Sequence, residues 1–435
     1  MMLLRRCRRP FGAARAIAAG LLSLGALHAA HAAPEMPGEV LLKLRTSAAL
    51  QPLLAKHQLV LVGRLGARPI YRLKVVGMRT TRDAIAALSV ESDVLVAEPN
   101  LVVRVPEAHK NGAWAIGTPT DYVMQWAPVA LRLPEAHLRS TGSGTRVAVL
   151  DTGVDTLHPA LAGRLLPGYD FVQRDADPSE TGTLLDPAFG HGTHVAGLVA
   201  LVAPDARIMP LRVLDAAGLG NAWTIAEAAV YAADPDANPA TDDGAHVINM
   251  SLGSTEPTRI VEMINMLVSC MVFSVTGDAT LDVSDVGYTT DRERCGAAAG
   301  PVVVAAAGND ASDAVPQYPA AEGGERLLAV AASNAQGQLA SFSNFGAWVS
   351  LAAPGEGVTS TVPGGGYGTW SGTSMASPLA AGVAALLRAG EPALAPGDVA
   401  RRLLQTTARL CGSELRQLDA AAALANQPGA DRLCP

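Results

Sequence analysis

From Arg146 onward, short apolar runs alternate with helical segments, and this alternation limits the fold more than any other feature of the chain. The runs are rich in Val, Ile, Leu and Ala with little polar alternation, which is typical of strands buried on both faces. They are Val147–Leu150, Arg207–Leu214, His246–Leu252, Pro301–Ala307 and Leu327–Ala332. Helical stretches lie between and after them, at His194–Val202, Ala222–Ala233 and Ser374–Leu387. The pattern predicts an α/β domain with a mostly parallel sheet and helices on both faces. Reactive groups are then expected beyond the carboxyl ends of the strands.

Residues 33–112 have a different pattern, which predicts a small α+β domain with the order β-α-β-β-α-β of a ferredoxin-like fold. Thr81 is expected to cap the second helix, which continues through Leu88. The expected strands are Glu39–Leu44, Leu59–Leu65, Ile70–Val76 and Val94–Val105, and the first helix is Ala48–His57. A linker from Pro106 to Thr120 follows. The proposed domains are therefore 33–112 and 113–435.

The N-terminus has the pattern of a secretory signal. Several arginines precede an apolar run from Ala16 to Ala30, and Ala30-His31-Ala32 fits a signal peptidase site. The run is shorter than the ~20 residues that a membrane-spanning helix needs. We interpret residues 1–32 as a cleaved signal, with an uncleaved anchor as the alternative. The mature protein is then exported to a periplasm or the extracellular space and has no membrane span.

Four cysteines remain after the signal, and an even number in an exported chain suggests two disulfides. Three pairings are possible. We predict Cys270–Cys295 and Cys411–Cys434, because this pairing closes the shortest loops. The net charge of −7 does not suggest a nucleic-acid partner.

Three segments contain residues suited to nucleophilic catalysis. Asp151 ends a buried strand in VAVLDTGVD, His191 opens a helix in HGTHVAG, and Ser374 opens another in SGTSMASP. A serine hydroxyl is a poor nucleophile at neutral pH, so it needs a base, and the base needs a carboxylate to fix its tautomer. All three positions can meet at one edge of the sheet. Each motif alone is weaker evidence, since DTG also occurs in aspartic proteases and HGTH could be a structural or metal-binding pair.

Taken together, the three segments resemble those of the subtilisin-like serine peptidases, or subtilases, and the resemblance runs from about Gln125 to Leu424. Subtilisin has the same chain order of Asp, His and Ser. The resemblance implies a secreted serine endopeptidase that works through an acyl-enzyme. In VVVAAAGND, Asn309 matches the asparagine that donates to the oxyanion in this family, although a turn-forming role fits its type too.

The resemblance also assigns residues that bind the substrate backbone. Ser251, Leu252 and Gly253 match one strand that pairs with an extended peptide, and Gly218 and Gly220 match the facing one. Such pairing gains main-chain hydrogen bonds whatever the substrate side chains are. The alternative for the two glycines is a plain loop. We interpret His194, Asp155 and His158 as structural residues of the helix and the loop.

The first domain resembles the inhibitory propeptide of these peptidases, and Val96–Asn100 is typical of its last strand. The resemblance implies a zymogen that processes itself and is inhibited by its own propeptide. Asp121–Trp126 resembles the start of a mature enzyme. Protein or peptide substrates are the expected partners, and a monomer is the expected state.

The chain departs from the family at a few positions. Leu379 stands where the family usually has His, and Ala160 replaces a calcium-binding Asp. The helix after His191 also runs into Ala203-Pro204 without the usual calcium-loop insertion. We therefore expect the tight calcium site to be absent. An extra segment, Ala279–Ala299, contains three aspartates and is either a new calcium loop or, as we favour, a solvated loop.

No cofactor is expected for the chemistry, and structural calcium is left open. Two other functions compete with the endopeptidase. A catalytically silent binding module is disfavoured by the intact set of Asp, His, Ser and Asn. An esterase or lipase is disfavoured by the chain order and by the absence of GxSxG around Ser374. The sequence does not indicate the side-chain specificity or the physiological substrate.

Overall fold

The computed structural model describes residues 33–107, 113–271, 289, 292–295, 300–430 and 434. The predicted signal and most of the Ala279–Ala299 insert, including Asp282, Asp285 and Asp291, therefore lie outside the described residues.

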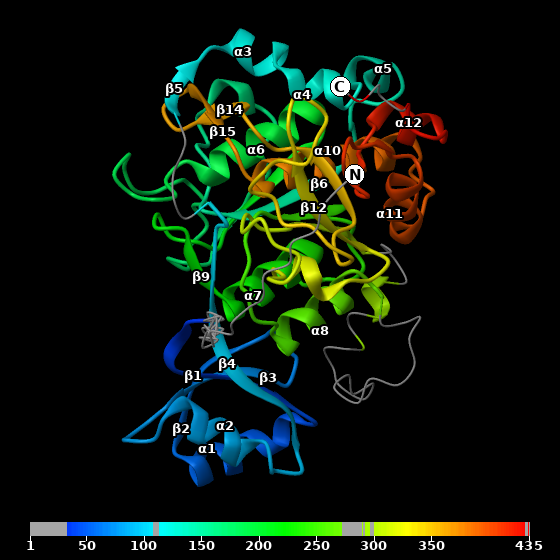
Figure 1. Ribbon diagram of the computed structural model, residues 1–435. Helices are drawn as coiled ribbons and strands as arrows, with labels where there is room; N and C mark the ends of the chain where they lie inside the picture. Colours follow the sequence, from blue (N-terminus) through cyan, green and yellow to red (C-terminus); the bar gives the residue numbers. More distant parts are fainter. Residues whose placement is uncertain are drawn as a thin grey trace, which may run out of the picture. The chain divides into compact units, whose positions relative to one another are not determined.

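The central element is a nine-stranded sheet with the order β16-β17-β13-β12-β11-β10-β6-β8-β7 (Figure 1). All neighbours are parallel except β16 and β17, so the predicted mostly parallel sheet is confirmed. The strands are β6 (Arg146–Asp151), β7 (Tyr169–Asp170), β8 (Arg207–Arg212), β10 (Val247–Met250), β11 (Val302–Ala306), β12 (Leu327–Ser333), β13 (Leu351–Pro354), β16 (Ala408–Arg409) and β17 (Arg416–Gln417).

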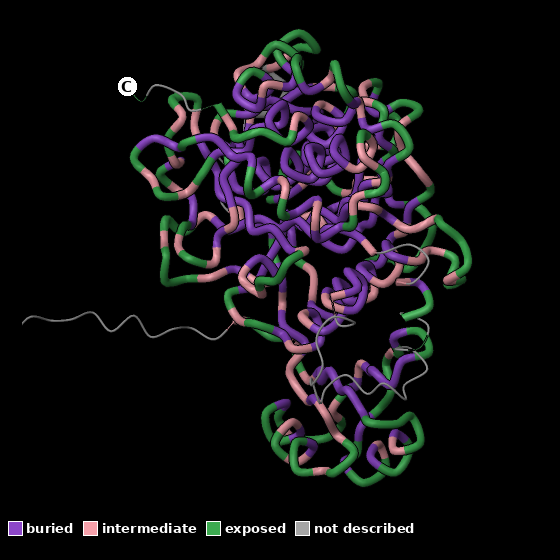
Figure 2. Tube along the Cα trace, turned by 90° about the vertical axis from the view of Figure 1, so that its right-hand side faces the viewer, coloured by how far each residue is buried: buried purple, intermediate pink, exposed green. Residues whose placement is uncertain are grey.

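Helices cover both faces of this sheet, as the uniformly apolar strands predict (Figure 1). In β6, Val147 and Val149 belong to the cluster that contains the helices α6 and α10, whereas Ala148 and Leu150 belong to the cluster that contains α7 and α8. Figure 2 shows the buried residues running through the sheet and the helices that flank it. The helices after β5 are α3 (Pro119–Met124), α4 (Trp126–Ala130), α5 (Leu133–His137), α6 (His191–Val202), α7 (Ala222–Ala233), α8 (Arg259–Val268), α10 (Thr373–Gly390), α11 (Pro396–Gln405) and α12 (Ala420–Ala425).

The N-terminal elements follow the predicted order β-α-β-β-α-β, and their sheet has the order β2-β3-β1-β4 with antiparallel neighbours. Its core is a separate cluster that includes Leu42, Leu73 and Leu88. The elements are β1 (Glu35–Leu44), α1 (Leu50–His57), β2 (Leu59–Arg64), β3 (Ile70–Val75), α2 (Thr81–Leu88) and β4 (Val94–Arg104).

The cap of α2 is Thr80, so the assignment of Thr81 as its cap is wrong by one residue. The Thr80 hydroxyl accepts the backbone N–H of Asp83, and the Asp83 carboxylate accepts the backbone N–H of Thr80. This reciprocal capping box requires an acidic residue three positions after the cap, and only Thr80 has one there.

Three short antiparallel pairings complete the fold. The strand β9 (Leu219–Asn221) pairs with the end of β4 and extends the N-terminal sheet. In the segment expected to be a linker, β5 (Ala113–Gly117) is instead a strand beside β15 (Gly366–Trp370), which also pairs with β14 (Val358–Val362). A strand this short is held by its partner, which is why the segment itself has no clear strand pattern.

Both predicted disulfides are present. Cys270 and Cys295 have Cα atoms 5.6 Å apart, and those of Cys411 and Cys434 are 5.4 Å apart. Each bond closes a loop of fewer than 30 residues.

Candidate active site

The three catalytic candidates and Asn309 meet at the carboxyl edge of the parallel sheet. Asp151 is the last residue of β6, and Asn309 follows β11 by three positions. His191 is the first residue of α6, and Ser374 is the second residue of α10. Because β6, β10 and β11 are parallel neighbours, the segments after them emerge at one edge, and the two helices begin there.

Asp151 and His191 form a buried, hydrogen-bonded pair. The imidazole Nδ1 lies 2.7 Å from Asp151 Oδ1, and both residues are about 1% exposed. The close approach depends on Gly192, because a Cβ atom there would lie 2.1 Å from the carbonyl oxygen of Gly153. The bond fixes the ring with its Nε2 toward a Glu107 oxygen that also accepts the Ser374 hydroxyl.

A half-buried carboxylate that no sequence motif marks, Glu180, lies behind this pair. Glu180 accepts the hydroxyl of Thr152 at 2.5 Å and both the hydroxyl and the backbone N–H of Thr193. The Thr152 hydroxyl in turn accepts the backbone N–H of Gly192 at 2.9 Å. Burial raises the pKa of Glu180 to about 7. Glu180 thus ties the residue after Asp151 to the first turn of α6.

Ser374 is fully buried, and its neighbour Thr373 orients Asn309. The side-chain oxygen of Asn309 accepts both the backbone N–H and the hydroxyl of Thr373, at 2.9 and 3.0 Å. The amide nitrogen of Asn309 is therefore turned toward the same space as the backbone N–H of Ser374. Thr373 was not singled out from the sequence, although it lies in the quoted SGTSMASP segment.

That space contains the carboxylate of Glu107, from the segment expected to be a linker. Its Oε1 accepts the Asn309 amide at 2.8 Å and the Ser374 N–H at 3.3 Å. Its Oε2 accepts the Ser374 hydroxyl at 2.6 Å and lies 3.2 Å from His191 Nε2. No motif in the sequence marks Glu107, because its position depends on where the chain crosses the site.

The electrostatics of this group favour an ion pair. Burial opposes a charge on His191, but Asp151 and Glu107 outweigh it and raise the pKa of His191 well above its ordinary value. Burial likewise opposes the charge on Glu107, but hydrogen bonds and the charge of His191 lower the pKa of Glu107 overall. The His191 ring therefore lies between two carboxylates and is held in its protonated form.

The predicted substrate-binding segments flank the chain that leads to Glu107. Arg104 and Gly253 exchange both backbone hydrogen bonds, at 2.9 and 2.8 Å. Val105 donates its N–H to the carbonyl oxygen of Gly218 at 3.1 Å. Gly220 lies opposite Val103 in the pairing of β4 with β9. The other two predicted residues have contacts of a different kind. Ser251 donates its hydroxyl to the carbonyl oxygen of Ser374, and Leu252 is buried in the core.

The histidines and the aspartate interpreted as structural have structural contacts. His194 stacks on Trp370 with ring centroids 4.6 Å apart and bonds the carbonyl oxygen of Gly368. Burial lowers the pKa of His194 to about 3. The His158 ring forms a hydrogen bond with the backbone of β15. The Asp155 carboxylate accepts backbone N–H groups from its own loop and from Gly364.

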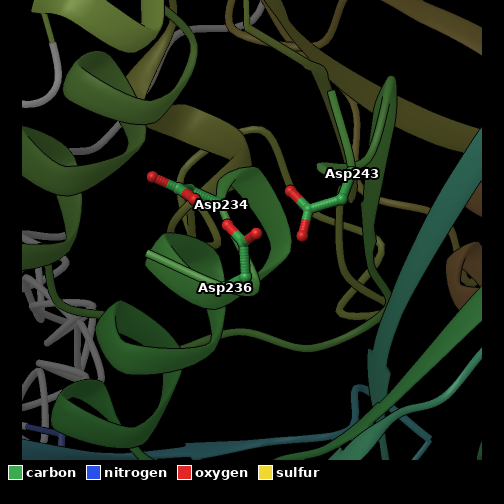
Figure 3. A group of neighbouring side chains, drawn as sticks. All are labelled: Asp234, Asp236 and Asp243. Carbon is green, nitrogen blue, oxygen red and sulfur yellow. The ribbon is translucent and has the colours of Figure 1, made fainter. Parts of the chain in front are cut away.

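The positions linked to calcium in related peptidases contain no acidic ligand in this chain. Ala160 donates its N–H to the ring of His158, and α6 ends at Val202 before Ala203. Elsewhere, Asp234, Asp236 and Asp243 gather between α7 and β10, with one oxygen of each within 4.8 Å of the others (Figure 3). Exposed acidic groups commonly gather in this way without an ion, so we assign them no metal.

Among the helices of the described residues, none combines the length and the apolar character needed to cross a bilayer.

Two regions of the chain match known protein families. Residues 142–433 match the subtilase family, and residues 26–100 match the fervidolysin N-terminal prodomain. The thermophilic serine proteinase of Bacillus sp. (strain AK1) is 37% identical over 330 residues, which cover 73% of this chain and 68% of that protein. Thermitase of Thermoactinomyces vulgaris is 37% identical over 273 residues, or 60% of this chain and 81% of that protein.

Among solved structures, the chain is similar to fervidolysin from Fervidobacterium pennivorans, described as a keratinolytic enzyme related to subtilisin. The TM-score is 0.68, with 22% identity, and the match covers 92% of this chain and 62% of that one. At this identity the likeness concerns the fold, and it extends across the N-terminal domain as well as the larger one.

Proposed function

We propose, from the premise that this chain belongs to the subtilase family of serine peptidases, that Asp151, His191 and Ser374 are its catalytic triad and Asn309 its oxyanion donor. One observation carries the proposal. His191 Nε2 and Ser374 Oγ both lie within hydrogen-bond distance of the same oxygen of Glu107, at 3.2 and 2.6 Å. Once that oxygen leaves, the base and the nucleophile face each other across the space it occupied.

The geometry supports acyl transfer in two steps. Ser374 Oγ attacks the scissile carbonyl carbon while His191 Nε2 takes the hydroxyl proton, and Asp151 stabilises the imidazolium. The developing oxyanion accepts hydrogen bonds from the Asn309 amide and the Ser374 N–H. His191 then gives its proton to the leaving amine, which breaks the C–N bond and leaves an acyl-enzyme. Water, deprotonated by His191, releases the acid and restores the serine. These protein groups supply the whole reaction, so no cofactor takes part in it.

Substrate is expected to bind as an extended strand between the Ser251–Gly253 segment and the Gly218–Gly220 segment. The support is that residues 102–105 already pair in this way with Gly253 and with the strand β9. Main-chain pairing of this kind accepts many sequences, which fits an endopeptidase acting on proteins or peptides.

The same proposal assigns the processing of the chain. Residues 1–32 are the export signal, 33–112 the inhibitory propeptide, and 113–435 the peptidase domain of a periplasmic or extracellular enzyme that acts as a monomer. We expect the enzyme to make the first cut itself, between about Val105 and Thr120, because the last propeptide strand already lies in the substrate cleft.

Ser374→Ala tests the proposal with little change in volume at the start of α10. The variant should fold and run on a gel as an uncut precursor, whereas the parent should give two pieces. Peptide hydrolysis should fall by several powers of ten, to the level that oxyanion binding alone provides. Self-processing at the parental rate, with no other protease present, would show that Ser374 is not the nucleophile.

Two further measurements separate the competing functions. A fluorophosphonate that labels the processed parent but not Ser374→Ala supports an active serine hydrolase over a silent binding module. Comparison of matched peptide and ester substrates tests the esterase alternative, which requires that only the ester is turned over.

A further inference from the structure

The segment that follows β4 crosses the candidate site in the manner of a bound peptide. Val102–Arg104 pair antiparallel with β9 on one side, and Arg104 exchanges two backbone bonds with Gly253 on the other. Val105 adds a bond to Gly218. The backbone is thus hydrogen-bonded as far as Val105, and Glu107, which follows Pro106, reaches the reacting groups.

At Glu107, a side chain rather than a peptide bond occupies the candidate site. The Glu107 carboxylate accepts hydrogen bonds from the Asn309 amide, the Ser374 N–H and the Ser374 hydroxyl, and it contacts His191 Nε2. A single carboxylate therefore engages both oxyanion donors, the nucleophile and the base. Its side chain is only 14% exposed, so water does not compete freely for these contacts.

We propose that the Glu107 side chain is a built-in inhibitor that occupies the oxyanion position and makes the uncleaved segment a poor substrate for its own site. This inference rests on the proposed catalytic roles of Ser374, His191 and Asn309. It goes beyond the expectation that the propeptide covers the cleft, because it names the residue and the groups that it disables.

Three consequences follow from the geometry. The two donors face Glu107 Oε1, so no scissile carbonyl oxygen can use them until the carboxylate withdraws. The Ser374 hydroxyl donates to Oε2 rather than to His191, so it is not aligned for deprotonation. Attack of Ser374 on the Glu107 carboxylate cannot form an acyl-enzyme, because the carboxylate carries no amine leaving group.

The base is disabled as well. His191 lies between Asp151 at 2.7 Å and Glu107 at 3.2 Å, and two anions beside an imidazole favour its protonated form. A protonated ring cannot accept the serine proton. The titratable groups that act on His191 are Asp151 on β6, Glu107 after β4, and His194 on α6 itself, of which only Glu107 belongs to the propeptide side.

The site also has the space that this inhibitor requires. A Cβ atom at Gly372 would lie 1.9 Å from Glu107 Oε1, so the carboxylate fits only because this position is glycine. Glu107 thus lies against the backbone two residues before Ser374, in a space that a substrate carbonyl can enter once the carboxylate leaves.

The test measures how fast refolded full-length precursor disappears on a gel. In the precursor, the first cut requires the state in which the Glu107 carboxylate has left the oxyanion donors. If this state is populated at about 10% or less, Glu107→Ala should speed the first cut by about tenfold or more. Glu107→Gln keeps the shape without the charge and should fall between parent and Ala. Glu91→Ala is the control, since Glu91 is a propeptide carboxylate that contacts Lys56 and His57 and should process at the parental rate.

A parental or slower rate in folded Glu107→Ala would overturn the inference. The same gel with Ser374→Ala keeps the two proposals apart: if Ser374→Ala stays uncut while Glu107→Ala is not accelerated, the inhibitory role fails and the triad stands. If Ser374→Ala cuts itself, the proposed catalytic triad is wrong, and the inhibitory role of Glu107 loses the premise on which it rests.

A second measurement covers the case in which Glu107→Ala does not fold. In the uncut Ser374→Ala precursor, NMR titration of the His191 ring reports its protonation directly. Adding Glu107→Gln should lower the pKa of His191 by about one unit or more, because one of its two anionic neighbours is gone. An unchanged pKa would mean that Glu107 only fills space, which contradicts the inference.

Discussion

One end of the Asn309 side chain is fixed by hydrogen bonds, and the other end faces the proposed reaction site. Its contribution to catalysis can therefore be measured by substitution. Thr373 fixes its side-chain oxygen with two hydrogen bonds, so the amide N–H group has a set direction. Asn309→Ala should lower kcat by about 10²–10³, or about 2.7–4 kcal/mol, the range established for the matching donor of subtilisin, with little change in KM. Steady-state kinetics on a small peptide substrate measure both.

Thr373→Val is the matched control for this prediction. It removes the hydroxyl that orients Asn309 and keeps the donor itself, so kcat should fall less than in Asn309→Ala. A loss confined to KM, or a melting temperature that falls together with kcat, would argue that Asn309 has only a structural part.

The residues that we propose to react could be singled out from the sequence, and the carboxylates around them could not. Asp151, His191 and Ser374 each lie in a segment whose residue types are tied to the chemistry. Glu180 and Glu107 lie in irregular segments, where a carboxylate has no pattern to distinguish it from a solvated one. Their contacts depend on how the chain returns to the site, which only the folded structure defines.

The strand β4 acts on two helices of the larger domain through alternate residues. Glu98 accepts the N–H groups of Arg259 and Ile260 at the start of α8, and Asn100 accepts the N–H of Trp223 at the start of α7. Residues two apart on a strand share one face, so both reach helix ends that need acceptors. These bonds link the propeptide to the enzyme away from the active site.

Glu98 makes this link sensitive to pH. Burial raises the pKa of Glu98 to about 7, and the charge of Glu262 adds to this, against two backbone hydrogen bonds and the charge of Arg259 that lower it. A carboxyl whose pKa is higher when bound than when free binds best while protonated. Propeptide affinity should therefore fall as pH rises from about 4.5 to about 7, by up to about tenfold per unit.

The measurement is inhibition of processed enzyme by its propeptide from pH 5 to 8, normalised at each pH to enzyme freed of propeptide. Glu98→Gln should flatten the profile between pH 5 and about 6.5, because Glu98 no longer titrates, whereas the effect of Glu107 on His191 acts above that range. Asn100→Ala should weaken binding equally at every pH, since it removes a contact without a proton. A profile that rises with pH in the parent, or is unchanged in Glu98→Gln, would contradict the prediction.

Elements with a strong pattern of their own were predicted closely, and elements held by partners were not. The helix α7 has the predicted bounds, and α2 ends at the predicted Leu88 and begins one residue earlier than expected, since both show a helical repeat. By contrast, β9 reads LGN, which resembles a loop, and β5 lies in a segment that was expected to be a linker. Such strands owe their existence to β15 and β4, and pairing between distant segments cannot be read from local residue types.

The whole molecule is built around a large, mostly parallel sheet. Related peptidases of this fold commonly bind calcium. Here Ala160 stands at the position of a calcium-binding Asp, and the helix α6 ends at Val202 without the usual loop. A site occupied at 1,000 times its dissociation constant adds about 4 kcal/mol, and a missing site adds nothing. For a domain of the length of 113–435, with about 2.1 cal/mol/K of unfolding entropy per residue, that difference corresponds to about 6 °C in melting temperature.

We therefore predict that a chelator lowers the melting temperature of this protein by no more than about 2 °C, well below the shift that a tightly bound ion would give. Calorimetry of the Ser374→Ala precursor with calcium and with EDTA measures the difference without autolysis. Thermitase, a relative of known sequence, serves as a reference protein in the same buffers. A large fall would mean that calcium binds elsewhere, and Asp236→Asn would then test the cluster of Asp234, Asp236 and Asp243 against the Ala279–Ala299 insert. If Asp236→Asn abolishes the chelator effect, the ion binds at the cluster, and if the effect persists, the aspartates of the insert are the remaining ligands to substitute.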